Sequence, residues 1–292
     1  MAPDDPVAVP QLRRDLEGER QVLLLVAAAG GTDAGCGIGA VSSVPGTAFA
    51  LARVLPGFRR RGVGSALYDA LSDHARRLGL AAVWTRVAED DPAGLDFVAH
   101  RGFVQVGREC QSRLRLTGDG RGPVAVPSGV RVVSLASRPD LVAEVHALAV
   151  ETSRDIPTAE EFVVPPLEEW RRENVEGALL EGSFVALAGG HVVGSAGLCD
   201  VPAAPGVAEN LLTAVAPGWR RRGVARALKA AQIDWARRHG YRELVTYSEE
   251  ANEPMRRLNA ELGYERRPDD LRFQGPLAGA DSARAGGGTA GG

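Results

Sequence analysis

A short segment of the chain combines arginine and glycine in a pattern that suits phosphate binding. The arginines 220–222 precede Gly223-Val224-Ala225, where an apolar strand-like segment gives way to a helical pattern. The first turn of a helix has N–H groups without intrahelical partners and carries partial positive charge. Small residues there let a phosphate approach the backbone, and flanking arginines add charge-assisted hydrogen bonds. The pattern predicts a site for a diphosphate whose attached chain runs back along the strand.

Two other interpretations of this segment are a solvated basic helix start and a contact with nucleic acid. Arginine opposes the helix dipole at this end, so helix stability does not explain three of them. The formal net charge of −3 argues against a general nucleic-acid binder, which is normally basic. We therefore favour phosphate binding and expect no nucleic-acid partner.

The same pattern occurs a second time, 161 residues earlier in the chain. The arginines 59–61 precede Gly62-Val63-Gly64, and 220 − 59 = 161. Residues 54–80 and 215–241 share sixteen identities in 27 aligned positions. A repeat unit this long indicates a duplicated domain rather than a solenoid.

Glycine- and proline-rich segments divide the chain into parts. We expect a first domain over residues 1–116, a linker over 117–129, a second domain over 130–277 and a disordered tail over 278–292. The first copy has no room for the first strand and two helices of the second copy. We therefore expect it to be truncated, or its start codon to be misassigned.

Hydrophobic periodicity predicts the elements that carry each arginine–glycine turn. In the second copy it predicts helices over 139–153, 167–176, 223–239 and 254–262, and strands over 130–135, 184–188, 191–198, 208–215, 242–247, 264–265 and 271–273. In the first copy it predicts strands over 22–28, 37–44 and 49–54 and a helix over 62–78. Each turn therefore joins a strand to a long helix.

Composition limits the class of protein. Hydrophobic residues make up 45% of the 292 residues and charged residues 24%, as in soluble globular chains. Three widely spaced cysteines form no disulfide or metal-ligand pattern, so we expect a reducing cytoplasm, no metal and no thiol nucleophile at Cys199. There is no N-terminal signal pattern, and the longest apolar run, 22–29, is too short to span a bilayer. We expect no membrane partner, and a monomer or homodimer.

The motif Arg-x-x-Gly-x-Gly/Ala, placed after a strand and opening a helix, resembles the acyl-CoA signature of the GNAT acetyltransferase superfamily. Both copies match it, and the second continues with Asn252-Glu253-Pro254-Met255, Leu258-Asn259 and Leu262-Gly263-Tyr264, similar to the family's closing segment. The resemblance covers nearly the whole chain. It implies an α/β (α+β) fold of two GNAT-like domains, each a mixed, mostly antiparallel sheet flanked by helices, with acetyl-CoA as the donor.

The resemblance also implies contacts for acetyl-CoA in each copy. The strand around Ala214-Val215 would pair with the pantetheine arm and polarise the thioester carbonyl, and Asn252 would contact the arm. A helix cap before Pro254 is an equally good interpretation of Asn252. The implied contacts are Ala214, Val215, Arg220, Arg221, Arg222, Gly223, Val224, Ala225 and Asn252, with Val54, Arg59, Arg60, Arg61, Gly62, Val63 and Gly64 in the first copy.

Glu209 is the candidate general base. An amine with a pKa of about 10 must lose a proton before it attacks a thioester, so a base helps. Glu209 precedes Val215 by six residues, so along an unbroken strand both side chains lie on one face. Family members often have a glutamate near this position. The competing interpretation is a surface carboxylate at the strand edge. Weaker candidates are Glu249, Glu250 and Tyr247.

Asn259 stands where many family members have a tyrosine that protonates the leaving thiolate. Asparagine has no proton to give near neutral pH, so that mechanism does not transfer to this chain. Solvent or the nascent ammonium could protonate the thiol instead, and Asn259 could simply fix the last helix through a hydrogen bond. The first copy has Ala48 opposite Glu209 and Val98 opposite Asn259, so we expect the active site in the second copy.

These features predict transfer of an acetyl group from acetyl-CoA to a primary amine of a small molecule or peptide, by direct attack in the second domain. The acceptor would lie beside the helices predicted over 139–153 and 167–176. Four acidic residues there could attract a cationic amine: Glu151, Asp155, Glu160 and Glu161. Tandem members of the family include mycothiol synthase and antibiotic-modifying acetyltransferases, and both acceptor classes stay open. A non-catalytic acetyl-CoA-binding module is the alternative from another class.

Overall fold

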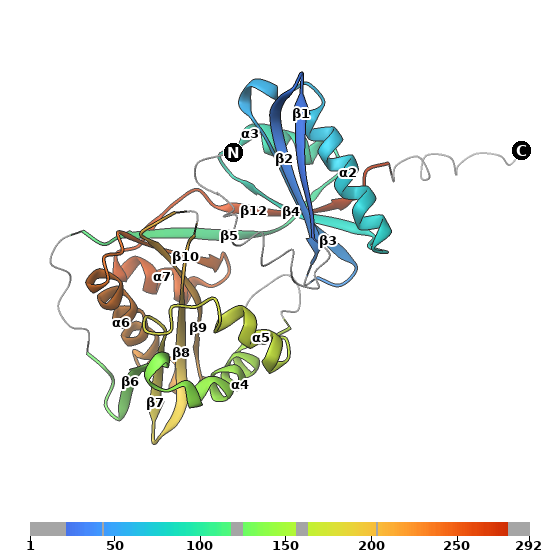
Figure 1. The fold of residues 1–292 in the computed structure, drawn as a ribbon. Helices are drawn as coiled ribbons and strands as arrows, with labels where there is room; N and C mark the ends of the chain where they lie inside the picture. Colours follow the sequence, from blue (N-terminus) through green and yellow to red (C-terminus); the bar gives the residue numbers. More distant parts are fainter. Residues whose placement is uncertain (1–21, 43, 118–124, 156–162, 203, 280–292) are drawn as a thin grey trace, which may run out of the picture. The chain divides into compact units, whose positions relative to one another are not determined.

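The chain folds into two compact units (Figure 1). The computed structural model describes residues 22–42, 44–117, 125–155, 163–202 and 204–279. Unit 1 is drawn from residues 1–107 and 270–292, and unit 2 is residues 108–269. Each unit has a mixed, mostly antiparallel sheet with helices, which confirms the predicted fold class. Most of the predicted linker and tail, at 118–124 and 280–292, lies outside the described residues.

Unit 1 is built on five strands that pair in the order β1, β2, β3, β4 and β12. Their bounds are Leu23–Ala29, Thr32–Val41, Thr47–Val54, Ala82–Ala88 and Asp270–Pro276. Only β3 and β4 are parallel. The helix α2 (Val63–Arg77) follows the first arginine–glycine turn and buries Leu71 and Ala75 against the sheet. The short helix α3 (Pro92–Ala99) packs Val98 against Leu271 and Phe273 of β12.

Unit 2 has the fuller set of elements. Its strands pair in the order β6 (Val130–Ser134), β7 (Phe184–Ala188), β8 (His191–Asp200), β9 (Val207–Val215), β10 (Glu243–Glu249) and β5 (Val104–Arg115), with β11 (Glu265–Arg266) on the far side of β5. Residues 108–115 of β5 belong to this unit. Only β9 and β10 are parallel.

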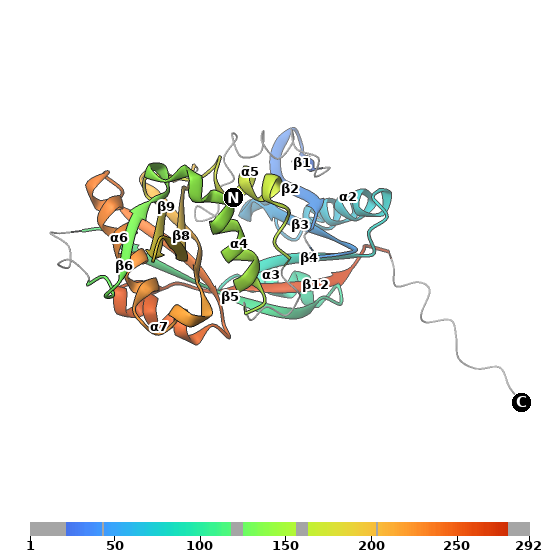
Figure 2. The same ribbon diagram turned by 90° about the horizontal axis from the view of Figure 1, so that it is seen from below.

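Helices cover both faces of the sheet in unit 2 (Figures 1 and 2). On one face lie α4 (Val142–Ser153) and α5 (Leu167–Asn174), and on the other lie α6 (Val224–Arg238) and α7 (Glu253–Leu262). The described residues of unit 1 include no counterpart of α4 and α5, and Val26 on β1 is 72% exposed. None of the described helices is long and apolar enough to cross a membrane.

The two copies exchange their closing strands. β5 comes from the first copy but pairs with β10 of the second, and β12 comes from the second copy but pairs with β4 of the first. The Tyr68 hydroxyl on α2 donates to the Pro276 carbonyl at 2.5 Å, which holds β12 in unit 1. The compact units therefore differ from the chain-order division expected from the sequence, because unit 1 is completed only by residues after Asp269.

Asp269, at the point where the chain leaves unit 2, has a fully buried side chain between two arginines. It accepts a hydrogen bond from Arg108 Nη1 at 2.9 Å and another from Arg266. Burial alone would raise the pKa of Asp269, but the hydrogen bonds from Arg266 and Arg108 outweigh burial and hold this pKa below its usual value. The carboxylate is therefore charged in the folded chain near neutral pH.

We expect Asp269→Asn to lower the free energy of unfolding of unit 2 by about 1–3 kcal/mol, because the change removes the buried charged acceptor that the partly exposed Arg108 and the exposed Arg266 share. The folded-state pKa lies below the unfolded value of about 3.9, so this stabilisation is present above that value and is lost as pH falls through the folded pKa. Urea unfolding followed by tryptophan fluorescence at pH 7 and pH 3 measures both effects. Equal stability of the two proteins at pH 7 would show that the carboxylate charge is not needed.

Candidate active site

The turn between β9 and α6 has a backbone suited to binding an anion. Arg221 and Gly223 both have left-handed backbone angles, with φ of 59° and 86°. Gly223 is the N-cap of α6, has no side chain to cap it, and no acidic residue follows in the first turn. The first helical N–H that reaches a helical carbonyl is that of Ala227, which donates to Gly223 O at 3.0 Å. The N–H groups at positions 224–226 are therefore available to a phosphate.

The same strained backbone occurs in the first copy. Arg60 and Arg221, equivalent in the repeat, are the two non-glycine residues with positive φ in the described part of the chain, at 62° and 59°. An L-residue in this region costs about 1–2 kcal/mol. Strain of this kind persists where the surroundings enforce it, and successive N–H groups in such a turn form a concavity for anions. The conformation is therefore a property of the turn in both copies.

We expect Arg221→Gly to raise the free energy of unfolding by about 1 kcal/mol, because glycine relieves the strained φ, and to weaken acetyl-CoA binding about fivefold by removing one exposed charge. Thermal unfolding and equilibrium binding measure the two effects. Arg60→Gly is the matched control and should stabilise unit 1 without changing turnover. Destabilisation by both substitutions would show that the backbone conformation is not the source of strain.

The arginine side chains tie the turn to its surroundings. Arg220 Nε donates to the Val215 carbonyl at 3.0 Å, and Arg220 Nη2 donates to Asp155 Oδ2 at 2.6 Å. The guanidinium of Arg222 lies 5.1 Å from the centre of the Trp219 ring. Asp155 therefore pairs with the turn rather than standing free for a cationic acceptor. Of the other predicted acidic residues, Glu151 is exposed, and Glu160 and Glu161 lie outside the described residues.

The first copy repeats this arrangement. Arg59 Nε donates to the Val54 carbonyl at 3.3 Å, and the guanidinium of Arg61 lies 5.7 Å from the Phe58 ring centre. Gly62 is the N-cap of α2 with φ of 82°. The two turns therefore share one arrangement of backbone and arginine side chains.

The strands that lead into the turn of unit 2 part from each other. β9 and β10 pair in parallel from Val207 and Glu243 to Asn210 and Thr246. Beyond that point β9 pairs only with β8 and β10 pairs only with β5. The facing backbone edge of β9, which includes Ala214 and Val215, has no partner there among the strands that the structure describes. An extended arm that enters this opening from the turn can hydrogen-bond to β9.

A β-bulge interrupts β9 between Glu209 and Val215. Ala196 pairs with Thr213 and Leu198 with Asn210, so one residue of β8 faces two residues of β9, at 211 and 212. The prediction that Glu209 and Val215 share a face is therefore wrong, because the extra residue reverses the alternation.

Val215 and Glu209 lie on opposite faces of the sheet. Val215 packs on the α6 side with Val224 and Leu228. Glu209 pairs directly with Cys199, on the opposite face. Burial raises the pKa of Cys199 to about 12, with Glu209 and Asp200 adding to the shift, so this thiol stays protonated and is no nucleophile.

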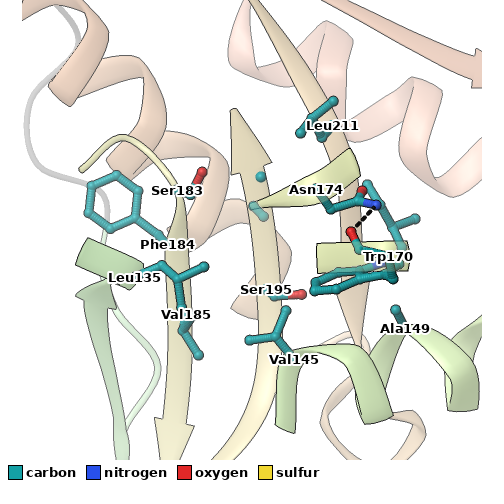
Figure 3. A pocket seen from close by; sticks show the side chains of 13 residues that line it. Leu135, Val145, Ala149, Trp170, Asn174, Ser183, Phe184, Val185, Ser195 and Leu211 are labelled. Carbon is teal, nitrogen blue, oxygen red and sulfur yellow. Dashed lines mark hydrogen bonds between the residues drawn. The ribbon is translucent and has the colours of Figure 1, made fainter. Parts of the chain in front are cut away.

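A pocket lies on the same face as Glu209, between α4, α5 and the strands β7 to β9 (Figure 3). Val145 and Ala149 of α4 and Trp170 of α5 form one wall, and Ser195 of β8 lies opposite them. Leu211, two residues after Glu209, also lines the pocket, which has no charged residue in its lining. The pocket suits an apolar or neutral part of an acceptor molecule.

Three predicted residues between β10 and the end of α7 have distinct settings. The Asn252 side chain caps α7 by accepting the Met255 N–H at 3.3 Å, which confirms the cap interpretation. Asn259 is 1% exposed, and neither of its side-chain polar atoms has a hydrogen-bond partner among the described residues, so the alternative of a structural hydrogen bond finds no partner there. Tyr247, a weaker base candidate, accepts a hydrogen bond from Gln111 at 2.9 Å.

A buried lysine, Lys229, lies in the middle of α6, and none of the sequence motifs described above includes it. Its side chain is 1% exposed, although lysine is rarely buried. The signal that could have found it is simple: Lys229 is the only lysine in the 292 residues, and all other basic side chains apart from histidine are arginines. Among the described residues, no group of histidine, cysteine, aspartate and glutamate could hold a metal ion.

Known proteins resemble the chain in sequence and fold. The model of the acetyltransferase (GNAT) family matches residues 2–103 and 137–264. Mycothiol acetyltransferase of Geodermatophilus obscurus is 28% identical over 232 residues, 76% of this chain and 71% of that protein. Mycothiol acetyltransferase of Saccharomonospora viridis is 30% identical over 230 residues, 75% of this chain and 72% of that protein.

Solved structures share the fold. A tandem GNAT protein from the clavulanic acid biosynthesis pathway has a TM-score of 0.76 at 22% identity, and the alignment covers 96% of this chain and 92% of that chain. A GCN5-related N-acetyltransferase from Sphaerobacter thermophilus has a TM-score of 0.74 at 19% identity, with 94% and 88% covered. The family match in both copies shows that the chain belongs to the acetyltransferase (GNAT) family, as an acyltransferase with two copies of the family's domain.

Proposed function

We propose that unit 2 transfers an acetyl group from acetyl-CoA to a primary amine of a small molecule or peptide by direct attack. The observation that carries this proposal is the juxtaposition in one unit of an anion-binding turn, an open strand edge and a neutral pocket. The turn ends β9, the opening runs along β9, and the pocket is lined by Leu211 of the same strand. Donor and acceptor would therefore meet at the bulge of β9.

The residues of the turn fit the diphosphate of acetyl-CoA. The free N–H groups at positions 224–226 and the arginines 220–222 would hold two phosphates without a metal ion. Asp155 would give up its contact with Arg220 when a diphosphate takes its place. The backbone of β9 from the bulge to Val215 would orient the arm and polarise the thioester carbonyl.

Glu209 would accept the proton that the acceptor amine loses on attack, directly or through one water. Its place on the pocket face supports this role better than the shared face with Val215 that the sequence suggested. Asn259 would supply hydrogen bonds to the donor from the α7 side, because its amide has no partner among the residues that the structure describes. Unit 1 has the turn but has Ala48 and Val98 at these positions, so it would have a structural or regulatory role.

The neutral pocket favours an acceptor with an apolar or uncharged group beside its amine. The named relatives make the acceptor of mycothiol acetyltransferases the first compound to test. Antibiotic amines form the second class, since tandem members of the family include antibiotic-modifying acetyltransferases.

The test is release of free thiol from acetyl-CoA by the full chain with a panel of amines that includes both classes. We expect turnover with at least one amine and none with the matching alcohols. Binding of acetyl-CoA without turnover on any amine would favour a non-catalytic binding module. Failure to bind acetyl-CoA at all would overturn the proposal.

A further inference from the structure

A buried polar cluster lies where β9 and β10 part. The last parallel pair of these strands is Asn210 and Thr246. The Tyr264 hydroxyl donates to Asn210 Oδ1 at 2.6 Å, and Asn210 Nδ2 donates to Gln232 Oε1 at 2.9 Å. Lys229 Nζ lies 3.5 Å from Thr246 Oγ1 and 5.3 Å from the centre of the Tyr264 ring. The cluster therefore marks the closed end of the opening between the strands.

The fold does not require this cluster. The first copy has the same strand-turn-helix arrangement with mostly apolar residues at the equivalent positions. At an offset of 161, Asn210, Lys229, Gln232, Asn259 and Tyr264 correspond to Phe49, Tyr68, Leu71, Val98 and Phe103. Buried polar groups cost free energy unless they are paired. A set of polar residues present in only one of two similar copies points to function rather than folding.

Lys229 and Asn259 lie on the two helices that follow the parting strands. α6 and α7 begin at the carboxyl ends of β9 and β10, and an ion pair between Arg226 and Glu261 joins the two helices. Lys229 is the sixth residue of α6 and Asn259 the seventh of α7, and both side chains are 1% exposed. An arm that starts at the turn and follows β9 inward runs toward the cluster that contains Lys229, where β9 and β10 part.

No negative charge among the described residues compensates the lysine. Burial is the single cause that lowers the pKa of Lys229, to about 7. The polar groups of its cluster are neutral: Thr246 on β10, Asn210 on β9, Gln232 on α6 and Tyr264. Burial also raises the pKa of Tyr264, the titratable neighbour, so its phenol stays uncharged. The site therefore suits a group that becomes negative only during the reaction.

We propose that Lys229 is the acid that protonates the departing thiolate of coenzyme A, in the role for which many family members have a tyrosine at the position of Asn259. The inference rests on the proposed acetyl transfer in unit 2. Lys229 donates one Nζ proton to sulfur as the C–S bond breaks and the new C–N bond forms. The proton that the acceptor nitrogen releases to Glu209 and solvent restores the charged lysine.

The direction of proton transfer is favourable. A free thiol has a pKa of about 8.5, above the value of about 7 for Lys229, so the ammonium gives its proton to the thiolate downhill. A developing anion in a water-poor interior is also stabilised strongly by a nearby cation. The amide of Asn259 would position the donor for this transfer.

The single lysine makes the test direct. Protein with 15N-labelled lysine gives one side-chain signal from the chain, and its pH titration reports Lys229 alone. We expect a midpoint near 7, and a larger change of signal with coenzyme A than with desulfo-coenzyme A, which lacks the sulfur. A midpoint near 10, or the same response to both compounds, would overturn the proposal.

The kinetics of Lys229→Met and Lys229→Arg distinguish a catalytic role from a structural one, because a structural role predicts no change in the pH dependence of kcat. We expect Lys229→Met to bind acetyl-CoA normally and to fold at least as stably as the wild type, but to have a kcat about 100-fold lower. The wild-type kcat should fall above pH 7 as Lys229 loses its proton, and the variant should not show this fall. Lys229→Arg keeps the positive charge but should also lack the fall in kcat above pH 7, because arginine does not release its proton. If the wild type binds and turns over acetyl-CoA and the Lys229→Met variant is equally active, this inference is wrong and the proposed function stands. Absence of turnover in the wild type would remove both.

Discussion

Gly223→Asp is expected to abolish release of thiol from acetyl-CoA, whereas Gly62→Asp should leave it near the wild-type rate. Gly223 opens α6 with φ of 86°, beside N–H groups that have no acceptor in the helix. An aspartate there places a negative charge against the diphosphate and accepts the hydrogen bonds that the phosphates need. We expect the Kd for acetyl-CoA in unit 2 to rise more than about 100-fold, since several charge-assisted bonds are lost together.

Asparagine supplies the matched control for this substitution. Gly223→Asn has nearly the same shape as Gly223→Asp and similar strain at positive φ, but it adds no charge. No atom lies within 3.4 Å of the position that a Cβ on Gly223 would take, so neither change meets a steric clash. A loss in the aspartate variant that exceeds the loss in the asparagine variant by tenfold or more assigns the effect to charge. If Gly62→Asp abolished turnover in a folded protein while Gly223→Asp did not, the active half would be unit 1.

The second large effect is expected for Glu209→Gln. Removal of a general base costs about 10²–10⁴-fold in rate, and glutamine keeps the size and the neutral hydrogen bonds of the side chain. We expect kcat to fall in this range, with the KM for acetyl-CoA unchanged within about twofold because the turn lies at the other end of β9. Raising the pH toward the amine pKa of about 10 should recover part of the loss, since the acceptor then loses its proton in solution.

Glu250→Gln controls for loss of a carboxylate in the same unit. Glu250 is one of the weaker base candidates, and its exposed side chain lies 3.9 Å from Arg108. We expect this variant to keep the wild-type kcat. Full activity of Glu209→Gln, or an equal loss in both variants, would remove Glu209 from the mechanism.

The internal repeat made most of the local structure predictable. The identity between the two arginine–glycine segments located both turns, and the glycines after them located the starts of α2 and α6. These features depend on residues close together in the chain, such as Gly223 and the helical pattern that follows it. The Asn252 cap was predictable for the same reason, because it acts within three residues.

Features that depend on distant residues were not predictable from one sequence. In the bulge, Gly197 of β8 faces two residues of β9, 211 and 212. Packing across the sheet sets this register, so it depends on residues far apart in the chain. The exchange of β5 and β12 depends on pairing between residues more than 120 positions apart, such as Glu243 with Arg115 and Asp270 with Ala88. A local pattern predicted a strand at 271–273, inside β12, but predicted none at β5 and could not choose the partner of either segment.

The central claim is that the turn at Arg220 to Ala225 binds the donor for a reaction at the bulge of β9. The most direct test is a crystal structure of the full chain with acetyl-CoA. We predict the diphosphate against the N–H groups of Val224 and Ala225, and the thioester between β9 and β10 near Leu211 and Asn259. Acetyl-CoA bound only at the turn of unit 1, or bound in unit 2 with its thioester outside the opening between these strands, would contradict the account.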